Sequence, residues 1–283
     1  MAPNRPSTVR MLLRDPIGVV GAVFVAMICA AALFAPWIAP HDPNRIHGRA
    51  RLQGPNAMFP LGTDELGRDL FSRALYGAQV SLQVSLTLVA VAAIIGVAIG
   101  VVSGYFRGWV DAVAMRIMDV LFAFPTILLA LAIVATLGTS IENLILALVI
   151  VYVPTFARIA RGATLSVAEE PYVEAARSVG VGQFGILLRH ILPNISAPVA
   201  VQVSISLAYA ILVEASLSYL GLGVQPPDAS WGSMLATGKL MVERSIWPSL
   251  VPGLFIVFTA LGFNLLGDAL RDTLDPRMRS ALR

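Results

Sequence analysis

The sequence predicts an all-α membrane protein that crosses the bilayer six times. Hydrophobic residues make up 57% of the 283-residue chain, and its mean hydropathy is +0.78. Charged residues make up 13%, roughly half the share found in soluble domains. The apolar residues gather in six runs, each close to the length of about 20 residues that a helix needs to span the hydrocarbon core.

The six runs define the expected spanning helices. In chain order they cover residues 17–39, 82–102, 117–137, 141–159, 198–220 and 250–266. A segment in lipid must satisfy its own backbone hydrogen bonds, so each run is expected to be helical. The first run follows a basic leader, as in a cleaved signal peptide, but it is longer than a typical signal core and five further runs follow. We therefore expect it to be an uncleaved signal-anchor.

Basic residues predict the orientation. With the amino terminus inside, 13 of the 20 basic residues lie in inner segments and seven in outer segments. Because cytoplasmic loops carry the excess of arginine and lysine, both termini are expected in the cytoplasm. The predicted organisation is a cytoplasmic tail (1–16) and a transmembrane domain (17–283). Its outer segments cover about 40–81 and 221–247, and one large cytoplasmic loop covers about 160–197.

Glycine and proline predict features inside the bundle. Gly96, Gly100 and Gly104 recur every fourth residue on the second helix, which favours close approach of another helix. Glycine is also common in membrane helices for no specific reason, so this pattern has a simpler alternative. Pro125 and Pro154 each remove a backbone hydrogen bond and are expected to kink the third and fourth helices.

A few charged residues lie within or beside the apolar runs. Glu214 lies in the fifth run, where an ionisable group costs about 2.5–3.5 kcal/mol on insertion scales. Two interpretations stay open: Glu214 contacts a translocation path, or it forms a structural ion pair near the outer surface. Arg116 and Asp119 are three residues apart on one helix face and are expected to pair with each other.

The cytoplasmic loop contains a short amphipathic segment, EAARSVGVGQFGILLRHILPN, at 174–194. Its first helix is expected to begin at Pro171, which suits the first helical turn, and to end at Gly180. A second helix, QFGILLRHIL, is expected to end at Pro193. The pair could pack on its own bundle, lie on the membrane surface or dock into a partner. Its small and apolar residues are Val173, Ala175, Ala176, Val179, Val181, Phe184, Leu187 and Leu188.

The sequence offers no catalytic, metal or cofactor site. Cys29 is the one cysteine, and the three histidines lack the spacing of a zinc helix. The stretch GSMLATGKL fails as a phosphate loop, because Ser233 stands where glycine is needed and Leu240 where serine or threonine is needed. The net charge of +3 fits basic cytoplasmic loops and gives no reason to expect nucleic acid as a partner.

The cytoplasmic segment resembles the EAA motif of permease subunits from bacterial ABC importers. The matching residues are Glu174, Ala175, Ala176, Gly180, Leu192 and Pro193. His190, in RHILPN, is typical of the dipeptide, oligopeptide and nickel branch of that family. The stretches 61–82, 115–125, 211–223 and 267–277 resemble its C-type subunit. Gln79 departs from the arginine that many relatives carry at that position.

The resemblance implies a type I ABC importer permease fold in the bacterial inner membrane. In that family the EAA helices are coupling helices, which sit in a groove of a cytoplasmic ATPase. The implied partners are a second homologous permease subunit, one or two ATPase subunits that bind ATP and Mg²⁺, and an extracytoplasmic substrate-binding protein. The implied substrate is a di- or oligopeptide, moved by alternating access.

Two rival functions can be set against the importer. The first is a secondary transporter or channel that works without ATP, for which Glu214 is the deep acidic candidate. The second is a membrane-embedded enzyme, against which the missing catalytic constellation argues.

Overall fold

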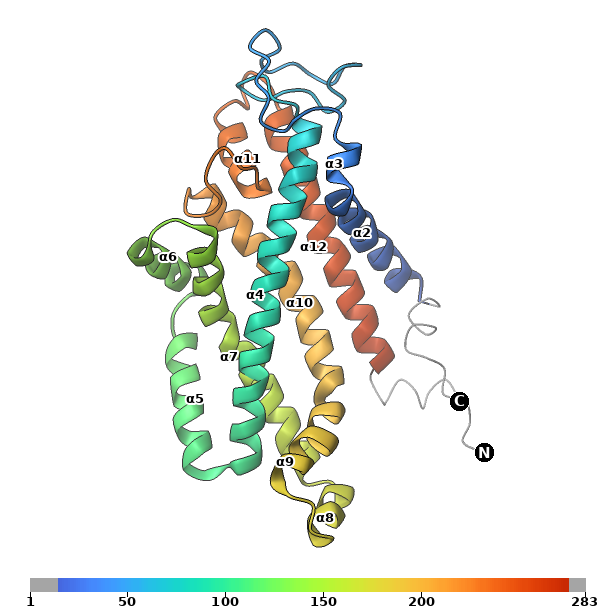
Figure 1. Ribbon diagram of the computed structural model, residues 1–283, viewed down its shortest axis with the longest axis vertical. Helices are drawn as coiled ribbons and strands as arrows, with labels where there is room; N and C mark the ends of the chain where they lie inside the picture. Colours follow the sequence, from blue (N-terminus) through green and yellow to red (C-terminus); the bar gives the residue numbers. More distant parts are fainter. Residues whose placement is uncertain (1–14, 275–283) are drawn as a thin grey trace.

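The computed structural model describes residues 15–274, and within this range the chain forms helices and no strands. The predicted all-α class is confirmed. Long helices lie side by side along the long axis (Figure 1), with α8 and α9 at one end and α11 at the other. All but the last two residues of the predicted tail, 1–16, lie outside the described range.

Five helical segments are long and apolar enough to cross a membrane, and a bent pair of helices makes up to six. The five are α2 (Pro16–Leu33), α4 (Leu70–Phe106), α7 (Ile141–Ala168), the segment Gln183–Tyr219 and α12 (Trp247–Leu274). The bent pair is α5 (Gly108–Phe122) and α6 (Thr126–Leu137), and the short helices outside the cytoplasmic loop are α3 (Ala35–Ile38) and α11 (Trp231–Lys239).

We expected the run at 117–137 to form one kinked helix, but the structure has two helices there. The axes of α5 and α6 differ in direction by 89°. Pro125 explains the break, because its ring excludes the preceding helical turn and disfavours helical backbone at Phe124. Pro154, in contrast, lies inside α7, which continues to Ala168.

Helix α4 begins well before its apolar run. The Asp69 carboxylate caps its first turn by accepting a 3.0 Å hydrogen bond from the Ser72 backbone N–H. Residues 70–81, which we assigned to an outer segment, are therefore helical. Hydropathy did not predict this start, because residues 70–81 are amphipathic. One side of this stretch packs beneath α11. There the Trp231 indole N–H donates to the Ala74 carbonyl at 3.0 Å.

The glycine stripe of α4 is a packing face against α7, as predicted. A Cβ atom on Gly96 would lie 2.6 Å from the Val153 carbonyl oxygen, and one on Gly104 would lie 2.9 Å from that of Arg161. One on Gly100 would collide with the Ala157 carbonyl. These distances leave no room for any side chain, so glycine is what allows the two backbones to touch.

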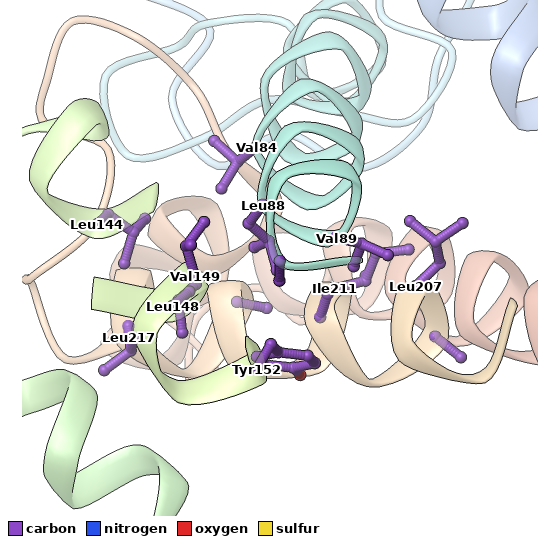
Figure 2. Close-up of a cluster of buried hydrophobic side chains, with 14 of the residues drawn as sticks. Val84, Leu88, Val89, Leu144, Leu148, Val149, Tyr152, Leu207, Ile211 and Leu217 are labelled. Atoms are coloured by element: carbon purple, nitrogen blue, oxygen red, sulfur yellow. The ribbon is translucent and has the colours of Figure 1, made fainter. Parts of the chain in front are cut away.

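The main core lies where α4, α7 and α10 (Leu192–Tyr219) meet. Figure 2 shows its labelled side chains: Val84, Leu88 and Val89 from α4, Leu144, Leu148, Val149 and Tyr152 from α7, and Leu207, Ile211 and Leu217 from α10. Lipid is as apolar as these side chains, so close packing and not escape from solvent is what holds the helices together.

Candidate functional site

The segment that the charge pattern places in the cytoplasm, called the cytoplasmic segment, begins with α8 (Pro171–Ser178), which starts and ends as its sequence predicts. Pro171 occupies the first helical turn. Gly180 has a φ of +83°, the left-handed conformation that glycine adopts without strain. Its N–H donates to the Arg177 carbonyl, and the Val181 N–H donates to the Ala176 carbonyl, both at 3.0 Å. This pair of bonds is a Schellman motif, which satisfies the last carbonyls of α8.

We expected the second half of the segment to be a separate helix that ends at Pro193, and this prediction is wrong. Helix α9 (Gln183–Ile186) passes through a π-helical turn, η1 (Leu187–Ile191), directly into α10. Pro193 lies in the first turn of α10. The wider π turn changes the hydrogen-bond register just before the proline, so the missing N–H does not stop the helix. The loop is thus continuous with a spanning helix.

One side of the segment is buried on its own bundle. Val173, Ile186 and Ile191 are almost fully buried, and they pack with Val101 of α4 and Ala160 of α7. The first of the three possible placements, contact with the bundle, therefore applies to this side.

The other side of the segment is exposed. Val179 is 80% exposed, Phe184 74% and Leu188 47%, and we call these three side chains the apolar loop face. Exposed apolar side chains of this kind are candidates for contact with a partner or with the membrane surface, the other two placements that the sequence left open. The sequence predicted that these residues make apolar contacts, but it did not predict which of them lie on the buried side and which on the exposed side.

The predicted motif residues lie around the apolar loop face. Glu174, Ala175, Gly180 and Pro193 are exposed, His190 and Leu192 are half-buried, and Ala176 is buried. The Glu174 carboxylate accepts no hydrogen bond and forms no ion pair with any residue in 15–274. It is therefore free to contact a partner.

Side-chain contacts hold the segment against the ends of α4 and α7. The Arg177 guanidinium lies 5.2 Å from the centre of the Tyr105 ring, a cation–π contact. Just before the segment, an Arg107 Nη2 atom at the end of α4 lies 2.8 Å from a Glu169 carboxylate oxygen at the end of α7, so this pair joins the two helix ends to each other. Both charged groups of this pair are largely exposed, so it contributes at most about 1 kcal/mol. Burial of Val173 and its neighbours is the stronger attachment.

Charged residues between α5 and α7 form cross-helix pairs. Arg158 lies 2.7 Å from Asp119, and Arg161 binds both carboxylate oxygens of Asp111, at 2.5 and 2.6 Å. The predicted Arg116–Asp119 pair is wrong, because α5 lies along α7 and presents Asp119 to that helix. These pairs tie the bent α5–α6 unit to α7.

Glu214 is fully buried between α10, α4 and α11. The Ser218 hydroxyl donates to its carboxylate at 2.7 Å, and Ser81 and Ser230 lie close to it. Of the two interpretations left open, the ion pair is wrong, since no cation pairs with Glu214 in the described part of the chain. The position gives no support to a contact with the translocation path, because neighbouring helices cover the carboxylate.

We expect Glu214→Leu to destabilise the chain by about 1–3 kcal/mol, because it leaves the Ser218 hydroxyl buried without its acceptor. Glu214→Gln keeps a carbonyl oxygen there and should lose much less. Thermal unfolding of the purified protein in detergent measures both. A leucine variant at least as stable as the wild type would contradict this role.

Gly180→Val should strain the loop corner by about 1–2 kcal/mol, because valine disfavours left-handed backbone. No atom crowds Gly180 within 4 Å, so the effect comes from the backbone alone, and substrate uptake should fall with it. Gly182 is equally uncrowded and has a φ of −63°, so Gly182→Ala is the control. Amide hydrogen exchange over 171–186 reads the strain, and equal exchange in both variants would refute it.

Taken together, these features describe a helical protein with several candidate membrane spans and an exposed loop that continues into one of them. Comparison with known proteins shows its family. Residues 96–280 match the family described as "Binding-protein-dependent transport system inner membrane component", and the chain belongs to this family. Residues 7–55 match the "N-terminal TM domain of oligopeptide transport permease C". The chain is thus an inner-membrane permease of the ABC transporter class.

Curated relatives cover nearly the whole chain. A dipeptide transport system permease protein of Alkalihalophilus pseudofirmus is 42% identical over 96% of this chain and 89% of its own length. A probable D,D-dipeptide transport system permease protein of Escherichia coli is 44% identical over 97% and 92%. A glutathione transport system permease protein of E. coli is 44% identical over 95% and 89%.

Proposed function

We propose that the chain is one of two permease subunits of an ATP-driven importer of short peptides. Three of the relatives are named for the transport of dipeptides, D,D-dipeptides or glutathione, compounds that contain peptide bonds. The second permease subunit would complete the translocation path, and a substrate-binding protein would deliver the peptide from outside. One or two cytoplasmic ATPase subunits would bind ATP and Mg²⁺.

The observation that carries this proposal is the two-sided cytoplasmic segment. Its buried side is attached to α4 and α7, and its second half continues into α10. Its exposed side presents the apolar loop face and the unpaired Glu174. A rigid element that contacts both an ATPase and the spanning helices is what coupling between the two requires. Closure of the ATPases would move the segment and, with it, α10.

Motion of α10 would also reach α7, and through it the ion pairs between α5 and α7 and the bent helix pair α5–α6. Helix α7 contacts α4, α6 and α10, so displacement of the segment changes the spaces between these helices. In the proposed cycle, ATP binding closes the ATPases and opens the path on one side of the membrane. Hydrolysis and release of the products restore the other arrangement.

The proposal gives the chain no chemistry of its own. ATP hydrolysis would belong to the partner subunits, and the mismatches with a phosphate loop at Ser233 and Leu240 support this. A secondary transporter is the alternative, and it requires an ion site near the midplane. Glu214 is its candidate, but serine side chains and α11 cover that carboxylate, which weakens the alternative.

Uptake by the purified assembly in liposomes separates the two functions. We expect a labelled dipeptide to accumulate only when ATP, Mg²⁺ and the binding protein are present, and to do so after ionophores collapse every ion gradient. A catalytic-site variant of the ATPase is the control and should abolish uptake. Accumulation driven by a proton or sodium gradient without ATP would overturn the proposed function.

A further inference from the structure

A cavity of about 380 Å³ opens between α6, α7 and α10. Its polar lining consists of Thr126 from α6, Tyr152 and Thr155 from α7, and Gln202, Ser206 and Tyr209 from α10. None of the side chains that line it is charged. The function proposed above does not assign these residues to any role.

The polar residues of α10 follow one face of the helix. Gln202, Ser206 and Tyr209 are spaced at i, i+4 and i+7, so their side chains point the same way. All three lie within a helix apolar enough to span the membrane. Polar side chains in such a helix point to a water-filled path or to a partner, because lipid offers them no hydrogen bonds.

Hydrogen-bonding capacity in the cavity remains unused. The Tyr152 side chain is only 8% exposed, and its hydroxyl has no hydrogen-bond partner within residues 15–274. The Gln202 amide donates to the Ser206 hydroxyl oxygen at 2.9 Å. This bond leaves the Ser206 hydroxyl proton and the second amide proton of Gln202 free to donate.

The break at Pro125 adds backbone donors. Thr126 and Ile127 are the first residues of α6, and both line the cavity. No side chain caps this helix end, so the first N–H groups lack helical acceptors. The aligned peptide dipoles give the same end partial positive charge. The cavity therefore offers side-chain and backbone donors beside a positive helix end, and this combination favours oxygen atoms with negative charge.

We propose that this cavity is a substrate subsite that binds the terminal carboxylate and adjoining carbonyl of a short peptide. The inference rests on the proposed import function and deepens it. Hydroxyl and amide donors together with a helix amino terminus bind oxygen acceptors. The lining contains no lysine or arginine. The carboxylate would therefore bind weakly enough to be released during transport. A cationic amino group would find no carboxylate among the lining side chains.

Transport of two matched ligands tests the subsite. The purified assembly in liposomes is supplied with binding protein preloaded with either a dipeptide or the same dipeptide carrying a carboxamide in place of its carboxylate. Preloading keeps the affinity of the binding protein out of the comparison. We expect Tyr152→Phe to raise the KM for the loaded dipeptide about fivefold or more. The carboxamide should be affected less, so the preference for the carboxylate falls.

Tyr219→Phe is the matched control, because this tyrosine lies on α10 outside the cavity, and it should leave the preference unchanged. Gln202→Leu tests the same subsite from α10, and it serves if Tyr152→Phe does not assemble. Unchanged transport in both cavity variants, or an equal loss for the two ligands, overturns the subsite. If the wild-type assembly shows no ATP-dependent uptake of either ligand, the import function itself is wrong.

Discussion

Phe184→Asp should release the ATPase subunits from the permease while the permease itself stays folded. Phe184 is 74% exposed, so removing its ring breaks little packing within the chain. In the proposed complex the ring is desolvated by the partner, and an aspartate there would be buried without a counter-ion. Aromatic anchors at interfaces contribute about 2 kcal/mol or more, which corresponds to a loss of affinity of about 30-fold or greater.

Leu240→Asp is the matched control for this prediction. Leu240 is 75% exposed and follows α11, at the opposite end of the molecule. Binding of the purified ATPase to each variant, followed with a labelled ATPase in detergent, gives the comparison. Wild-type affinity in the Phe184→Asp variant would show that the apolar loop face does not bind the ATPase. The same loss of affinity in the Leu240→Asp variant would show that the effect is not specific to that face, and it would contradict the prediction as well.

Gly100→Leu should prevent the spanning domain from folding. Even a Cβ atom at this position meets the Ala157 backbone of α7, so a leucine forces the two helices apart. Overpacking a core costs typically 1–3 kcal/mol, and separating backbones along a whole glycine face costs more. We expect no monodisperse protein after detergent extraction, as measured by size-exclusion chromatography of a fluorescent fusion.

Gly162→Leu provides the control within the same helix pair. Gly162 lies on α7 with no atom within 4 Å of an added Cβ, and leucine has the higher helix propensity. We expect this variant to extract and elute like the wild type. A folded Gly100→Leu protein would show that the glycine stripe is not required for the contact between α4 and α7.

Local chemistry was enough to predict much of the fold. Hydropathy and length located the spanning helices, and four-residue spacing identified the glycine face of α4. The start of α8 at Pro171 and its end at Gly180 were also predictable, because each depends on backbone preferences of one residue and its neighbours.

Three prolines show where such local rules stop. Pro125 separates two helices at 89°, Pro154 lies inside α7, and Pro193 follows a π turn that continues into α10. Each proline removes the same N–H, so the difference comes from the surrounding packing. The π turn in particular is flanked by Ile186 and Ile191, which are buried against α4 and α7, and sequence periodicity does not describe such contacts.

Side chains that act across helices were the least predictable. Asp119 has Arg116 within reach on its own helix, yet it pairs with Arg158 on α7. Glu214 lies beneath α11, which approaches α10 only through the outer segment. The sequence did not predict that the Tyr152 hydroxyl lacks a partner, because the sequence pattern of a tyrosine in an apolar run is the same as that of an ordinary core residue. Its significance depends on the cavity formed by three separate helices.

The most direct test of the central claim is purification of the tagged chain from its native membrane, with the partners identified by mass spectrometry. We expect a second permease subunit and one or two ATPase subunits, with the ATPases lost from the Glu174→Lys variant and retained by Glu243→Lys in the outer segment. Recovery of the chain alone, or of the same ATPases with both variants, would contradict coupling through the cytoplasmic segment.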